Sequence, residues 1–157
     1  YGALIRCYEK LGDWSRGRQS LRPCLDLFAH AENNGVLLND QVFTTMISAC
    51  ANASDLHTAL RMWDKRKDSK IKAGVQGFGA IIKACLYTNN LFKAYQFVKE
   101  MEAEQIMPSD TTFVLFFSFF EKRGMESEAR AMYQKMKQLG VEPNHKLRDL
   151  LKRLKLE

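Results

Sequence analysis

The sequence lacks the patterns that mark membrane-spanning and β-sheet proteins. It contains no run of 18 apolar residues, so it predicts no transmembrane helix and no membrane insertion. The richest apolar segment, residues 113–120, is too short to span a bilayer. No stretch alternates apolar and polar residues with a period of two, whereas apolar stripes of helical period recur along the chain. These patterns predict an all-α fold.

Metal-binding patterns are also missing. The chain has four cysteines, but they form neither a Cys-x-x-Cys pair nor a cluster with histidine. Cys50 and Cys85 lie 35 residues apart, which favours equivalent small apolar packing positions over metal ligands or disulfide partners. Free thiols of this kind suit a reducing compartment. We therefore expect no metal ion and no cofactor.

The sequence also lacks a recognisable catalytic arrangement. Its three histidines, His30, His57 and His145, fall in separate predicted helices or caps, with no nucleophile or paired carboxylate at a suitable position. The aspartates at positions 13, 40, 55 and 110 fit helix caps and turns. We therefore predict that the chain is not an enzyme.

Acidic charge is in deficit. The formal net charge is +6 and the pI is about 9.2. This balance favours an anionic partner, with nucleic acid first, but a merely soluble basic surface fits it equally well. The hydrophobic fraction of 46% is normal for a folded protein, so disorder is not expected.

One pattern accounts for most of the chain, because residues 40–144 repeat with a period of 35 residues. Three sets of equivalent residues show the step, namely Phe43, Phe78 and Phe113; Ala59, Ala94 and Ala129; and Ile71, Ile106 and Val141. The step contains no insertion or deletion. A fixed period in the range of about 20 to 50 residues marks stacked supersecondary units.

Each unit is predicted to be two helices joined by a tight turn. We expect a divergent first repeat over residues 1–39, regular repeats over 40–74, 75–109 and 110–144, and a capping helix over 145–157. In the second repeat, Asp40 is predicted to cap the first helix and Ser54 the second helix.

The first repeat is seven residues longer than the others, since Tyr1 precedes Phe43 by 42 residues. Two interpretations of residues 13–23 stay open: two extra turns of the second helix, or a kink or loop at Pro23. The chain also begins at Tyr1 in the middle of a unit, so we expect a fragment or a processed form of a longer chain.

The last segment predicts an amphipathic helix. Leu147, Leu150, Leu151 and Leu154 have the spacing of one apolar helical face, and basic residues crowd the other face. We favour a terminal cap with a polar outer surface. A basic strip that binds phosphates is the alternative.

The residues within the period resemble the pentatricopeptide repeat family in its 35-residue P-type form. That pattern runs from an opening aromatic and an apolar pair, through a turn and an A-L-x-L-F-like segment, to a methionine and a G-I-x-P-D-like end. The fourth unit shows it as Phe113-Val114, Phe116-Phe117, Gly124, residues 129–133 (ARAMY), Met136 and residues 140–144 (GVEPN). The resemblance covers nearly the whole chain and implies a right-handed solenoid of helical hairpins, here with about four repeats.

The resemblance also implies a binding site. In the family, the first helices line a concave face that binds single-stranded RNA, and each base is read by the residue after the opening aromatic together with the last residue of the repeat. Carried onto this chain, the base-facing pairs are Gly2 with Asn39, Thr44 with Gly74, Gly79 with Ser109, and Val114 with Asn144. Several of these residues offer no side-chain hydrogen bond, so we expect weak base specificity.

The resemblance places a phosphate-contacting lysine just before the turn between the two helices. Lys10 and Lys122 match this position, whereas Asn52 and Tyr87 occupy it in the two middle repeats. The basic face of the tail adds three expected phosphate contacts, Lys146, Lys152 and Arg153.

Two functions follow from the resemblance. The first is an RNA-binding protein of mitochondrial or chloroplast RNA metabolism, acting in transcript processing, splicing, stability or translation. The second is a structural module of an organellar ribosome or other ribonucleoprotein particle that contacts proteins or ribosomal RNA by shape. The weak reading positions and the phenylalanines of residues 113–120 favour the second, although packing between repeats is expected to bury these rings, including the off-stripe Phe119.

Overall fold

The chain is helical in the computed structural model, and no strand occurs in the residues that it describes. The structure describes the backbone of residues 1–157 and every side chain except those of Cys7 and Leu11. The elements in chain order are α1 (Gly2–Leu11), the 3₁₀ segment η1 (Trp14–Leu21), α2 (Arg22–Asn33), α3 (Asp40–Asn52), α4 (Leu56–Asp68), α5 (Val75–Tyr87), α6 (Leu91–Ala103), α7 (Asp110–Arg123), α8 (Glu126–Gln138) and α9 (His145–Arg153). The all-α prediction is confirmed.

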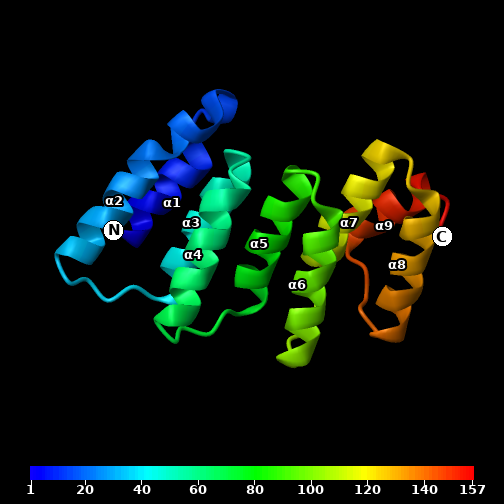
Figure 1. Cartoon of the computed structure of the whole chain (residues 1–157). Coiled ribbons are helices and arrows are strands. Elements are labelled where there is room, and N and C mark those ends of the chain that lie inside the picture. Colours follow the sequence, from blue (N-terminus) through cyan, green and yellow to red (C-terminus); the bar gives the residue numbers. More distant parts are fainter. The chain divides into compact units, whose positions relative to one another are not determined.

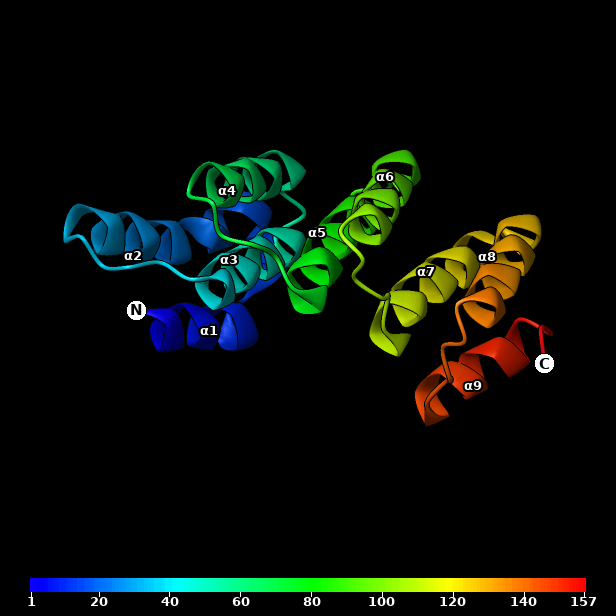
Figure 2. The ribbon, with the colours of Figure 1, turned by 90° about the horizontal axis from the view of Figure 1, so that it is seen from below.

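The helices belong to two compact units, Tyr1–Phe97 and Val98–Glu157, with α6 contributing residues to both (Figure 1). In the first unit, α3 packs against α1, α4 and α5. Figure 2 shows α1, α3 and α5 in one row, with α2 and α4 in a second row beside them. The first helix of each hairpin in this unit therefore lies in the same row.

The turns repeat with the period of the sequence. Left-handed backbone conformation, with positive φ, occurs at Ser54, Asn89 and Gly124 after the first helices, and at Gly35, Lys70, Gln105 and Gly140 after the second helices. In each turn, the next residue donates its N–H to the carbonyl five residues earlier, as in Asp55 N to Cys50 O at 2.9 Å and Asn90 N to Cys85 O at 2.8 Å. This bond is the mark of a Schellman C-cap, which ends a helix and reverses the chain.

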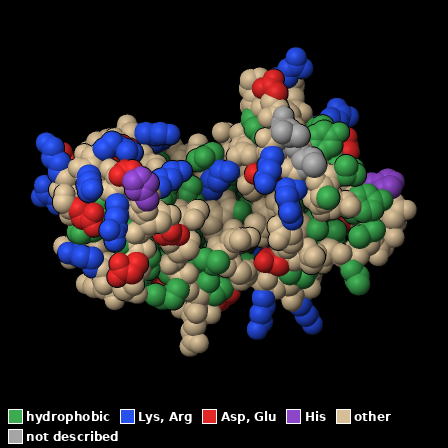
Figure 3. Space-filling view, turned by 180° about the vertical axis from the view of Figure 1, so that it is seen from behind, with side chains coloured by type: hydrophobic (Ala, Val, Ile, Leu, Met, Phe, Trp, Pro, Cys, Tyr) green, Lys and Arg blue, Asp and Glu red, His purple; other side chains and the backbone are tan. Residues whose placement is uncertain are grey.

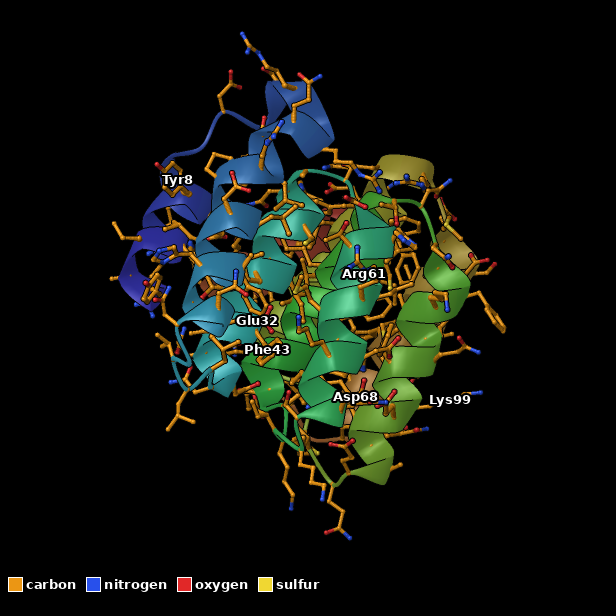
Figure 4. The ribbon with its side chains drawn as sticks, turned by 60° about the vertical axis from the view of Figure 1, so that its left-hand side comes forward. Tyr8, Glu32, Phe43, Arg61, Asp68 and Lys99 are labelled. Atoms are coloured by element: carbon orange, nitrogen blue, oxygen red, sulfur yellow. The ribbon has the colours of Figure 1, made fainter. Side chains whose placement is uncertain are left out.

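The core of the first unit is built from the repeated apolar positions. Phe43, which is labelled in Figure 4, and its equivalent Phe78 are both fully buried. Each receives an aromatic ring from the preceding second helix: Phe28 meets Phe43 edge-on at 5.5 Å, and Trp63 meets Phe78 at 4.9 Å between ring centroids. Edge-to-face pairs at these distances stabilise the packing by about 0.5–1.5 kcal/mol beyond area burial.

The second unit buries its phenylalanines. All five phenylalanines of α7 are buried, namely Phe113, Phe116, Phe117, Phe119 and Phe120. Phe119, which lies off the main stripe, is only 6% exposed; it packs edge-on against Phe120 and lies beneath the guanidinium of Arg123. The helix α9 packs against α7 through buried Leu147, Leu150 and Leu151.

The cysteines that the structure describes are free and buried, as the packing interpretation requires. Cys24, Cys50 and Cys85 make no disulfide. Burial raises the pKa of the Cys50 thiol to about 12, so this group stays protonated and unreactive near neutral pH. Across the described side chains, no group of three or more His, Cys, Asp or Glu residues is placed to hold a metal ion.

The extra residues of the first repeat form a separate short element. Residues 14–21 adopt the 3₁₀ segment η1, which is bent at Gly17 (φ 56°, ψ −125°). The α-helix α2 begins only at Arg22, with Pro23 in its first turn, where a missing N–H breaks no helical hydrogen bond. The structure thus decides between the two interpretations: the insertion does not lengthen the second helix.

Two helix caps are formed by residues adjacent to the predicted ones. The cap of α3 is Asn39, whose Oδ1 accepts from Val42 N at 3.1 Å, rather than Asp40. The cap of α4 is Asp55, which accepts from Thr58 N, whereas Ser54 is the left-handed turn residue before it. Both predictions were wrong because two adjacent residues can each cap a helix, and the turn geometry selects one of them.

An ion pair ties the insertion to the second repeat. Arg18 of η1 donates from Nε to Asp55 Oδ2 at 2.7 Å and from Nη2 to Asp55 Oδ1 at 3.1 Å. The Asp55 side chain is only 4% exposed and also accepts from the Thr58 hydroxyl. Burial by itself raises the pKa of Asp55, but the hydrogen bonds from Arg18 and Thr58 outweigh it and lower the pKa to about 2.

We predict that Asp55→Asn lowers the free energy of unfolding by about 1–2 kcal/mol at pH 7, because the charge is lost while the cap is kept. Since the folded pKa lies below the unfolded value near 3.8, this contribution is fully present above that value and disappears as the pH falls toward about 2. Urea denaturation at a series of pH values measures it. Asp68→Asn, on the exposed end of α4 (Figure 4), is the matched control and is expected to change little. A difference independent of pH would contradict the assignment.

Candidate nucleic-acid interface

The first helices expose one narrow stripe each. On α3 the stripe is Thr44, Ser48 and Asn52, and on α5 it is Gly79, Lys83 and Tyr87. These residues are spaced i, i+4 and i+8, so they lie along one face of the helix, and most of their helical neighbours are buried. In the second unit, Val114, Ser118 and Lys122 form the equivalent stripe of α7.

The last residue of each predicted repeat is the N-cap of the following first helix. These residues are Asn39, Gly74, Ser109 and Asn144. Asn39 and Asn144 use the side-chain oxygen as a cap, accepting from Val42 N at 3.1 Å and from Leu147 N at 2.9 Å. Capping therefore occupies one lone pair of each amide oxygen, whereas the N–H groups of each amide make no cap hydrogen bond and can donate to a ligand.

An acidic residue lies beside the Thr44 and Gly74 pair and contacts Gly74. Asp40, one turn before Thr44, accepts from Gly74 N at 3.3 Å. A Cβ on Gly77 would come within 3.3 Å of Thr44 Oγ1, so this glycine permits the close approach of α5 to α3. Thr44 is the one residue of this pair with a side-chain hydroxyl.

Three other positions predicted to face a base carry no polar side chain. Gly2 lies at the start of α1, where a Cβ would meet Val42. Gly79 faces open space, with nothing within 4 Å of a Cβ placed there. Val114 is half-buried on α7. Ser109 has a hydroxyl, but it lies 3.5 Å from the Thr112 hydroxyl.

A polar network missed by the sequence analysis crosses three first helices. Ser48 of α3 donates to Glu9 Oε1 of α1 at 2.8 Å, and Asn52 contacts the carboxylate and the backbone carbonyl of Glu9 at 3.4 Å. Lys83 of α5 reaches Ser48 Oγ at 3.5 Å. Burial lowers the pKa of Lys83, and the Glu9 carboxylate opposes this effect. The 35-residue spacing of Ser48 and Lys83 was the available signal, since it puts them at equivalent positions.

The predicted phosphate contacts lie mostly in solvent. Lys10, Lys122, Lys146 and Lys152 are exposed, and Lys and Arg side chains gather over the second unit in Figure 3. Arg153 is already paired: it donates to the two Glu121 oxygens at 2.7 and 3.3 Å. These hydrogen bonds lower the pKa of Glu121 and raise that of Arg153, so this guanidinium mainly joins α9 to α7.

A separate hollow of about 580 Å³ lies beside α1 and η1. It is lined by Leu4, Tyr8, Gly12, Asp13, Arg16, Gln19, Ser20 and Pro23. Tyr8 is labelled in Figure 4. None of the stripe residues lines this hollow, so it is a different surface from the candidate interface.

The comparisons assign the family. The pattern described as the pentacotripeptide-repeat region of PRORP matches residues 8–154. The chain therefore belongs to the pentatricopeptide repeat family, and the predicted helical-hairpin solenoid class is confirmed. A comparison with proteins of curated function found no match.

Solved structures share the fold. The structure of PPR10 with an 18-nt psaJ RNA element is 19% identical, with a TM-score of 0.83 over 96% of this chain and 21% of that chain. PPR10 from maize is 16% identical, with a TM-score of 0.68 over 99% of this chain and 23% of that chain. The PPR domain of Arabidopsis thaliana protein-only RNase P 1 in complex with tRNA is 15% identical, with a TM-score of 0.67 over 88% of this chain and 72% of that domain. The chain thus spans about a fifth of the PPR10 structures.

We predict that Asn144→Ala destabilises α9 by about 1 kcal/mol, because Leu147 N loses its cap. Asn144→Asp keeps the acceptor oxygen and is expected to stay within a few tenths of a kcal/mol of the original. Amide hydrogen exchange along α9 measures both. Equal exchange rates in the alanine variant and the original protein would show that the cap contributes nothing.

Proposed function

We propose that this chain is an RNA-binding helical-repeat module, and that the exposed stripes of the first helices in each unit contact single-stranded RNA. The observation that carries the proposal is the composition of those stripes. Lys83 and Tyr87 on α5 and Lys122 on α7 place cations and an aromatic ring at the positions left accessible by hairpin packing. The net charge of +6 supports an anionic ligand.

Two related folds bind different forms of RNA. PPR10 was solved with a short RNA element and the PPR domain of protein-only RNase P 1 with tRNA. We favour a single strand for this chain because stacking on an exposed aromatic ring requires unpaired bases. Folded tRNA is the competing ligand in the test below.

Base selectivity is expected to be weak. Gly2, Gly74, Gly79 and Val114 offer no side-chain hydrogen bond to a base, and Asn39 and Asn144 already use their acceptor oxygens as caps. A site that discriminates bases needs placed donors and acceptors. Affinity in this module thus comes mainly from charge and stacking.

We place this activity in mitochondrial or chloroplast RNA metabolism, in transcript processing, splicing, stability or translation, and without catalysis by this chain. The support is the family membership. The alternative is a structural module of an organellar ribosome or other ribonucleoprotein particle, contacting ribosomal RNA or protein by shape. The weak reading positions favour it, but the α7 phenylalanines do not, because they are buried inside the second unit.

We predict that the chain binds single-stranded RNA in a salt-dependent manner. Neutralising the exposed lysines of the first helices and of α9 is expected to remove most of this salt dependence. Replacing Lys10, Lys122, Lys146 and Lys152 by Gln is expected to lower the slope of log Kd against log salt by up to about 3, at about 0.7 per phosphate contact. Fluorescence anisotropy with labelled homopolymers and with tRNA measures the slope and the preferred ligand.

The matched control removes the same number of charges elsewhere. Lys70, Lys72, Lys99 and Lys137 are exposed on second helices or the turns after them, and their replacement by Gln is expected to change the slope little. Lys99 is labelled in Figure 4. Equal effects of the two quadruple variants would show that affinity depends on the net charge of the protein and not on the position of these lysines. Absence of binding at low salt, together with recovery of the protein in a large particle, would reject the RNA-binding proposal in favour of the structural module.

A further inference from the structure

Tyr87 stands out among the residues that the family pattern left unexplained. It occupies the last position of α5, at the place where Lys10 and Lys122 stand in their repeats. Its side chain is 53% exposed, although the chain buries most of its other aromatic residues. A large exposed ring on the stripe opposite the second helices requires an explanation.

The surroundings of Tyr87 place a cation and open space on the same stripe as the exposed ring. The Lys83 ammonium lies 5.3 Å from the centroid of the Tyr87 ring, on the same stripe and one turn earlier. Lys83 is itself located by Ser48, which donates to Glu9. One further turn back, Gly79 leaves open space where other residues would project a side chain. An aromatic face, a cation and an open approach therefore follow one another along α5.

We propose that Tyr87 stacks one base of a single-stranded RNA, and that Lys83 contacts the phosphate of the same nucleotide. This inference rests on the proposed function and extends it, because it moves the principal contact of this repeat from Gly79 to residues one and two turns further along α5. Stacking on an aromatic ring tolerates every base, which agrees with the weak base reading at Gly74 and Gly79.

The competing explanation is purely structural. A lysine four residues before a tyrosine on a helix can stabilise the helix by a cation–π contact, without any ligand. This explanation predicts a change in stability but no change in RNA affinity when the ring is removed. The two explanations are therefore separated by binding measurements on folded variants.

The test compares Tyr87→Ala, Tyr87→Phe and Lys83→Met with Phe92→Ala as the matched control. Phe92 is 73% exposed on the second helix α6, so its removal deletes a similar exposed ring away from the stripe. Anisotropy with labelled oligoadenylate is expected to show about 5- to 150-fold weaker binding for Tyr87→Ala, with an unchanged salt slope. The Kd values of Tyr87→Phe and Phe92→Ala are expected to stay within about twofold of the original, because each variant still has an aromatic ring at position 87.

An abasic strand and the lysine variant complete the design. On the same strand with its bases removed, the loss caused by Tyr87→Ala is expected to vanish, because no base remains to stack. Lys83→Met is expected to lower the salt slope by about 0.7. The stacking site is rejected if Tyr87→Ala weakens oligoadenylate binding no more than Phe92→Ala does. It is also rejected if Tyr87→Ala weakens binding of the abasic strand as much as binding of oligoadenylate. In either case, salt-dependent binding by the original protein still supports the proposed function. If the original protein binds no RNA, both are rejected.

Discussion

Burial of the first helices is the constraint on which the rest of the structure depends. In the first unit, α3 is enclosed by α1, α4 and α5, so beyond Gln41 only Thr44, Ser48 and Asn52, spaced i, i+4 and i+8, reach solvent. Small residues on the enclosed faces, such as Ala49, Ala84 and Gly77, let the helices approach closely. Whatever this module binds along its first helices must be recognised by three or four side chains per helix.

The turns make this arrangement repeat. From α2 onward, each helix is followed by a residue in the left-handed conformation and is closed by a hydrogen bond from the next residue to the carbonyl five residues earlier. The helix α1 instead ends at Gly12 in an extended conformation. Several of these residues are not glycine, for example Ser54, Asn89 and Lys70, and each accepts a conformational cost of roughly 1–2 kcal/mol. The buried interfaces between helices offset that cost, so the turn positions recur even where the residue type varies.

In the stripe of the first unit, the residues that join the helices are also those proposed to bind RNA. Glu9, Ser48 and Lys83 connect α1, α3 and α5 through side-chain hydrogen bonds, and the half-buried Lys83 is oriented by them. A preoriented cation loses less side-chain freedom on contacting a phosphate than a fully mobile one. Glu9 limits the positive potential at the same place, which moderates the affinity for any anion.

Much of the fold and part of the candidate site could be predicted from particular residues. The steps from Phe43 to Phe78 to Phe113 established the hairpins, and the basic tail was correctly placed on an amphipathic helix, α9. The caps were displaced by one residue because Asn39 and Asp40, like Ser54 and Asp55, have similar capping ability. Residues 13–23 stayed undecided because a 3₁₀ segment has no sustained apolar period to detect.

The sequence by itself determined the all-α class, the 35-residue period and the positions of the hairpins, since these depend on local periodicity and turn chemistry. Only the tertiary structure decided how the helices are rotated against one another. That rotation places Ser48 between Glu9 and Lys83, engages Arg153 with Glu121, and leaves Tyr87 uncovered. Contacts between helices depend on packing at distances that no local pattern encodes, so the residues available to a ligand emerged only once the helices were packed.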